Sequence, residues 1–89
     1  MATVYLPRSL VTLFPEPPPR HLDLECDSIG GLVDELDARW PGMRDRLLDA
    51  GPQLREHINV FVDGERVRDL GSPVGSESLV HVIPAVAGG

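Results

Sequence analysis

A single amphipathic stripe in the middle of the chain constrains the fold more than any other feature. Its apolar side chains fall at positions i, i+3, i+4, i+7 and i+11, namely Ile29, Leu32, Val33, Leu36 and Trp40. Side chains at these spacings share one face of an α-helix. Ser28 supplies a favourable N-cap, and Pro41 ends the helix because proline disfavours helical backbone in the residue before it. The stripe therefore predicts one main helix over residues 29–40, with its apolar side turned to the core.

Two alternating segments precede this helix. In residues 3–6, Val4 and Leu6 are predicted to face the core and Thr3 and Tyr5 the opposite side; in residues 21–26 the inward set is Leu22, Leu24 and Cys26. Such alternation is typical of a strand with one buried face. The prolines clustered between positions 15 and 19 exclude both a helix and a central strand there. We therefore expect a two-stranded hairpin whose strands are joined by a loop.

The second half of the chain predicts a short helix and three further strands. Apolar positions in residues 43–48 indicate the short helix, and residues 58–62 alternate as a strand. Asp63-Gly64 follows this strand and is a strong signal for a hairpin turn. Residues 65–68 return as a shorter strand, and residues 79–83 form the last strand.

This order of elements has few compact solutions. A sheet and a helix must each bury an apolar face, so the economical arrangement packs the helix on one face of the sheet. We predict an α+β fold of the β-grasp (ubiquitin-like) type, a mixed five-stranded sheet with one main helix on one face. The predicted core consists of Val4, Leu6, Leu24, Leu32, Val33, Leu36, Ile58, Val60, Val62, Val80 and Val82.

The length and composition set the domain organisation and exclude several functions. The 89 residues form one domain over residues 1–83, followed by a flexible tail over residues 84–89. The net charge of −6 argues against partners that are nucleic acids or anionic membranes. No apolar stretch approaches the ~20 residues that span a bilayer, and no signal peptide is visible, so we expect a cytoplasmic monomer.

No catalytic constellation is visible in the sequence. Gly30-Gly31 lacks the pattern of a phosphate-binding loop. The histidines at positions 21, 57 and 81 share no metal-ligand spacing with Cys26, the single cysteine. Cys26 has no cationic neighbour in sequence that would favour its thiolate, so we interpret it as a small apolar side chain within a strand. The chain is therefore not expected to be an enzyme or to bind a metal.

The end of the chain is its unusual feature. After Pro84, which ends the sheet, the sequence runs through small residues to Gly88-Gly89. Glycine lacks a Cβ atom, so such residues can thread a narrow channel and expose the terminal carboxylate to the catalytic atoms of another protein. From the spacing alone, an idle tail on a ubiquitin-like interaction module is an equal alternative.

A family resemblance favours the first interpretation. The segment 58–65 and the stretch from His81 through Pro84-Ala85-Val86-Ala87-Gly88-Gly89 closely resemble the MoaD/ThiS family of sulfur carriers, and the tail is most similar to the CysO type. The resemblance implies that Gly89 carries the sulfur as a thiocarboxylate, a 1-thioglycine. The segment of Ala85, Val86, Ala87 and Gly88 would then thread the active site of a partner enzyme.

The resemblance also implies the partners. An E1-like adenylyltransferase of the MoeB/ThiF type would use ATP and magnesium to adenylate Gly89, and sulfur from a persulfide or sulfide donor would displace AMP. A second enzyme would accept the sulfur for cysteine or another sulfur-containing metabolite; it would be cysteine synthase-like or thiosugar synthase-like. The alternative within the family is the small subunit of molybdopterin synthase, which docks on the large subunit. The carrier itself would bind no cofactor.

The sheet alternation suggests where these partners dock. With the helix on one face of the sheet, Phe61, His81 and Ile83 point to the opposite face. Exposed apolar groups gathered beside such a tail indicate an interaction patch. We therefore expect Phe61, His81 and Ile83 to contribute to partner docking.

Overall fold

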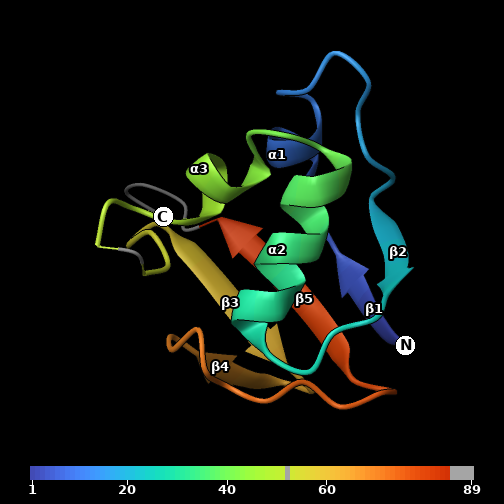
Figure 1. Cartoon of the computed structure of the whole chain (residues 1–89), viewed down its shortest axis with the longest axis vertical. Coiled ribbons are helices and arrows are strands. Elements are labelled where there is room, and N and C mark those ends of the chain that lie inside the picture. Colours follow the sequence, from blue (N-terminus) through green and yellow to red (C-terminus); the bar gives the residue numbers. More distant parts are fainter. Residues whose placement is uncertain (52, 85–89) are drawn as a thin grey trace.

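The computed structural model describes residues 1–51 and 53–84 and contains a five-stranded sheet with one long helix across it (Figure 1). In chain order its elements are β1 (Ala2–Tyr5), α1 (Arg8–Val11), β2 (His21–Leu24), α2 (Ile29–Arg39), α3 (Met43–Leu47), β3 (Ile58–Val62), β4 (Glu65–Val67) and β5 (Leu79–Pro84). The strand order is β2-β1-β5-β3-β4; β1 and β5 are parallel and the other neighbours antiparallel. This mixed sheet confirms the predicted β-grasp fold.

The main helix begins at the predicted residue and ends one residue before the predicted end. The Ser28 side chain accepts a hydrogen bond from the Gly31 N–H at 3.0 Å, which satisfies one of the unpaired donors of the first turn. The helix ends at Arg39, one residue earlier than expected, and Trp40 caps it with an N–H bond to the Leu36 carbonyl at 2.8 Å. Its apolar stripe lies against the sheet, and Leu36 is completely buried.

The predicted core is confirmed at most positions and wrong at two. The buried members are Val4, Leu6, Leu24, Leu32, Val33, Leu36, Val60, Val80 and Val82. Ile58 and Val62 are only half-buried, although they share a sheet face with Val60. They stand at the two ends of β3, where Ile58 borders an open cleft and Val62 borders the β3–β4 turn. Leu22 and Cys26, predicted to face inward, are also half-buried.

The connection between β1 and β2 contains a helix that the sequence did not predict. Helix α1 is a single turn that follows Pro7, and its Leu10 and Val11 side chains are buried in the core. The proline cluster begins after this turn, so the expectation of a loop was right only for the second part of the connection. One turn of helix is too short to show the periodicity on which the prediction relies.

The β3–β4 hairpin turns at Asp63-Gly64, as predicted. Both residues have positive φ, 50° and 87°, as a two-residue type I′ turn requires. The Asp63 N–H donates to the Leu79 carbonyl at 2.8 Å, and the Asp63 carboxylate accepts from the Leu79 N–H at 2.9 Å. This reciprocal pair fixes the turn to the start of β5. None of the helices in the described residues is long and apolar enough to cross a membrane.

Candidate functional site

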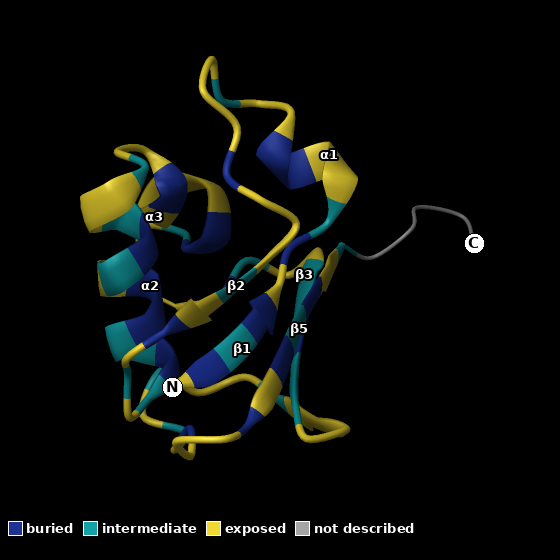
Figure 2. Cartoon of the chain, turned by 90° about the vertical axis from the view of Figure 1, so that its right-hand side faces the viewer, coloured by how far each residue is buried: buried dark blue, intermediate teal, exposed yellow. Residues whose placement is uncertain are grey.

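One face of the sheet is left uncovered by the long helix. Figure 2 shows α2 and α3 on one side of the sheet, while the opposite face of β5 and β3 is turned to solvent. Each strand places alternate residues on this outer face. Residues that pair across neighbouring strands lie on the same face, so the sheet register determines which side chains meet there.

Aromatic and imidazole rings form a row across this outer face. The register pairs Tyr5 with His21 on one side and with His81 on the other, and pairs His81 with Phe61. The rings of Tyr5 and His81 are stacked, with centroids 4.5 Å apart and planes only 5° from parallel. Tyr5 and His21 lie 5.8 Å apart at 28°. We call His21, Tyr5, His81 and Phe61 the ring row.

Exposed aliphatic side chains extend the ring row along β5. Leu79 pairs with Thr3 and Ile83 with Asn59, so both lie on the outer face, and each is 45% exposed. Three of the five exposed large hydrophobic residues of the described chain, Tyr5, Leu79 and Ile83, therefore gather here. Such gathering of apolar side chains is typical of an interaction surface.

The structure places the predicted docking residues together. Phe61 and His81 are direct neighbours on adjacent strands, and Ile83 lies two residues further along β5 on the same face. Tyr5 and Leu79 were not named from the sequence, although the alternation already placed Tyr5 opposite to Val4 and Leu6. The sequence pattern did not predict that β1 pairs with β5, and this pairing brings Tyr5 beside His81.

The tail predicted to carry sulfur begins directly after β5. This strand extends one residue beyond the expected end, to Pro84, which pairs with Ile58. The predicted tail residues Ala85, Val86, Ala87, Gly88 and Gly89 lie outside the described residues. Residues 85–89 span at most about 16–18 Å when fully extended. Any enzyme that acts on Gly89 must therefore bring its catalytic atoms within that distance of Pro84.

A metal centre or the Cys26 thiol would be an alternative place for sulfur chemistry. The described residues contain no group of three or more His, Cys, Asp and Glu side chains arranged to hold a metal ion. Burial raises the pKa of the Cys26 thiol above its ordinary value of 9.0, and the Asp27 and Glu35 carboxylates raise that pKa further. The thiol is therefore protonated at neutral pH, and a protonated thiol is a poor nucleophile.

The family model of the ThiS family matches residues 12–89, which include every element from β2 to β5 and the Gly88-Gly89 end. The chain belongs to the ThiS family. It is 32% identical over 68 residues to the sulfur carrier protein CysO of Mycobacterium tuberculosis, a match that covers 71% of this chain and 73% of that protein.

Solved structures of the same type share the whole fold. The crystal structure of the Amycolatopsis orientalis BexX/CysO complex contains a chain with a TM-score of 0.86 and 27% identity to this ThiS-family chain, covering 100% of both. The crystal structure of Mycobacterium tuberculosis CysO gives a TM-score of 0.84 and 25% identity, covering 97% of this chain and 100% of that one.

Proposed function

We propose that this ThiS-family chain is a sulfur carrier whose Gly89 carboxylate is converted to a thiocarboxylate and delivered to a biosynthetic enzyme. The observation that carries this proposal is the family match, which extends through residue 89. The similarity to sulfur carrier protein CysO supports it. The chain is then a co-substrate rather than an enzyme, and the sulfur is attached at Gly89 rather than at the Cys26 thiol.

The chemistry proceeds in two steps on the partner enzyme. A carboxylate is a poor acyl donor because its leaving group would be oxide. The Gly89 carboxylate attacks the α-phosphorus of ATP, pyrophosphate leaves with magnesium, and an acyl adenylate forms. Hydrosulfide then attacks the carbonyl carbon and AMP leaves, so one oxygen of the carboxylate is replaced by sulfur. An E1-like adenylyltransferase of the MoeB/ThiF type supplies the catalysis.

Partner recognition uses the outer face of the sheet. The ring row with Leu79 and Ile83 provides a surface of ring and aliphatic side chains centred on β5, the strand that leads into the tail. Burial of aromatic side chains contributes strongly to binding at protein interfaces. Docking on β5 brings the partner close to Pro84, from which residues 85–89 lead to Gly89. The enzyme that accepts the sulfur docks on the same outer face. The similarity to CysO favours cysteine synthesis as the pathway that receives the sulfur.

Sulfur loading tests this function. The purified chain is incubated with a MoeB/ThiF-type adenylyltransferase, ATP, magnesium and sodium hydrosulfide, and its intact mass is measured. We expect the mass gain that corresponds to replacement of one oxygen by sulfur, located by fragmentation at Gly89 and absent when ATP is omitted. An unchanged mass with an enzyme that loads another ThiS-family carrier under the same conditions would contradict the proposal.

A further inference from the structure

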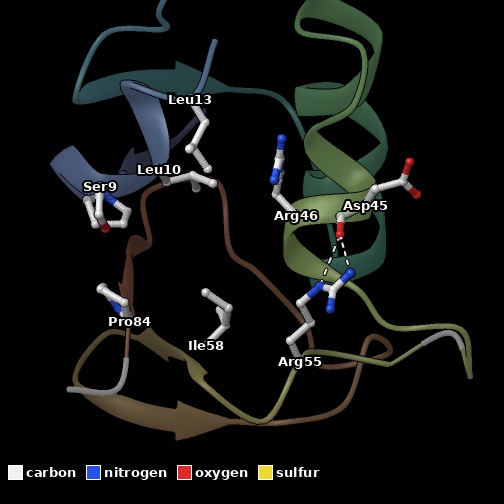
Figure 3. Close-up of a pocket in the computed structure, with 9 residues that line it drawn as sticks. Ser9, Leu10, Leu13, Asp45, Arg46, Arg55, Ile58 and Pro84 are labelled. Carbon is white, nitrogen blue, oxygen red and sulfur yellow. Dashed lines mark hydrogen bonds between the residues drawn. The ribbon is translucent and has the colours of Figure 1, made fainter. Parts of the chain in front are cut away.

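A cleft of about 350 Å³ lies beside the point where the tail begins (Figure 3). Helix α1 forms one side of the cleft, α3 and Arg55 form the other, and the ends of β3 and β5 form its base. The apolar part of the lining comes from Leu10 of α1 and Leu13 just after it, together with Ile58 and Pro84. This mixture of apolar wall and charged rim is typical of a site for a partner side chain.

Arg55 is held rigidly at the rim of this cleft. Its Nε and one terminal nitrogen donate to the Asp45 backbone carbonyl at 3.0 and 2.7 Å. The Asp45 carboxylate points away from the cleft, as Figure 3 shows, so the acidic group of this residue does not face the cleft interior. A guanidinium fixed in this way loses little side-chain entropy when it meets an anion.

Arg46 also lines the cleft, from α3, and is unpaired among the described residues. Its side chain is exposed on α3, whereas the neighbouring Arg44 forms an ion pair with Asp34 of α2. The chain as a whole carries a net charge of −6, whereas the residues that line the cleft include two arginines and one carboxylate residue, Asp45. Cationic side chains in a cleft of an otherwise acidic protein favour binding of an anionic group of a partner.

We propose that this cleft binds a carboxylate side chain of the adenylating partner, with Arg46 as the principal ion-pair donor. The inference rests on the proposed function, because it assigns the cleft to the same partner. The planar guanidinium fork matches a carboxylate, and the apolar wall strengthens the pair by excluding water. Pro84 lines the cleft, so a partner group seated there lies next to the start of the tail. The contact therefore aligns the tail with the partner active site.

The test compares two charge reversals by binding titration against the MoeB/ThiF-type adenylyltransferase. Arg46→Glu replaces the cleft cation, and the control Arg39→Glu changes the net charge equally at the end of α2, in a different hollow beside Trp40. At low salt we expect Arg46→Glu to raise the Kd about tenfold over that of Arg39→Glu. The difference between the variants shrinks as salt is added. Circular dichroism and thermal unfolding verify that both variants are folded.

Equal Kd values for the two variants, with both folded, would overturn the cleft proposal. Sulfur loading of the unmodified chain is measured alongside, so the two hypotheses fail separately. If the unmodified chain is loaded and Arg46→Glu binds as the control does, only the cleft assignment is wrong. If the unmodified chain is never loaded by a competent enzyme, the proposed function fails first and the cleft assignment falls with it.

Discussion

At the residue scale, the stacked pair of Tyr5 and His81 shows that the outer surface depends on strand pairing, because its side chains come from different strands. The two rings come from strands more than seventy positions apart in sequence and lie 4.5 Å apart because β1 and β5 are neighbours whose register pairs Tyr5 with His81. Phe61 joins them from β3 on the other side of His81. Residues with such pre-ordered rings lose little side-chain freedom when a partner covers them.

Phe61 tests the docking role of this surface. We expect Phe61→Asp to weaken binding to the adenylyltransferase by about tenfold or more, because the interface would bury an unpaired charge. Phe61→Leu keeps the apolar character and retains most of the affinity. Both variants are titrated against the enzyme, and their circular dichroism spectra are compared with that of the unmodified chain. Unchanged affinity of a folded Phe61→Asp variant would remove Phe61 from the docking surface.

Cys26 tests whether any side-chain thiol takes part. Its raised pKa keeps the thiol protonated at neutral pH, so iodoacetamide should alkylate it more slowly than a small free thiol at pH 8. The Cys26→Ser variant should gain sulfur at the same rate as the unmodified chain, since we propose that the sulfur is attached at Gly89. Loss of loading in a folded Cys26→Ser variant would mean that sulfur passes through this thiol.

At the element scale, the packing of α2 on the sheet supplies the main apolar contact of the fold. Leu36 is fully buried in it, so we expect Leu36→Ala to lower the free energy of unfolding by about 2–5 kcal/mol. Leu13, which is 51% exposed after α1, provides the matched control, and Leu13→Ala should change stability far less. Urea unfolding of both variants measures the difference. Similar losses in the two would show that the stripe of α2 is not core.

The elements differ in how well the sequence predicts them. Helix α2 and the Asp63-Gly64 turn were predicted because each depends on local signals: a long periodic stripe with an N-cap, and a residue pair suited to positive φ. Helix α1 was missed because its four residues cover only about one helical turn, too few for an apolar pattern to repeat. The burial of Leu10 and Val11 is decided by where the β1–β2 connection folds back, which is a tertiary contact.

The candidate site shows the same division between local and tertiary information. Alternation correctly turned Phe61, His81 and Ile83 to one face, because it needs only the pleat of a strand. Alternation did not indicate that Tyr5 stacks on His81, since strand order is fixed by the whole sheet. The cleft beside Pro84 was likewise invisible, because its lining comes from α1, α3, β5 and the region around the start of β3.

At the scale of the whole molecule, the parallel course of β1 and β5 separates the ends of the described chain. β5 runs to Pro84 beside the cleft, whereas Met1 precedes β1 at the opposite end of the sheet (Figure 1). The outer face and the cleft both lie on or beside β5, and residues 85–89 follow that strand. In the proposed function, the folded part would supply the docking contacts and Gly89 the transfer group.

The most direct test of this account is sulfur loading of a chain that lacks Gly89. Deletion withdraws the carboxylate by one residue, about 3.3–3.6 Å, which is as large as the 3–3.5 Å separation that reacting atoms need. Gly88→Val serves as a companion that keeps the length but adds a branched side chain. Intact-mass measurement with the adenylyltransferase, ATP, magnesium and hydrosulfide should show loading of the unmodified chain, and little or none of either variant, while all three unfold alike in urea. Sulfur gain by the Gly89-deleted chain at the rate of the unmodified chain would contradict the central claim.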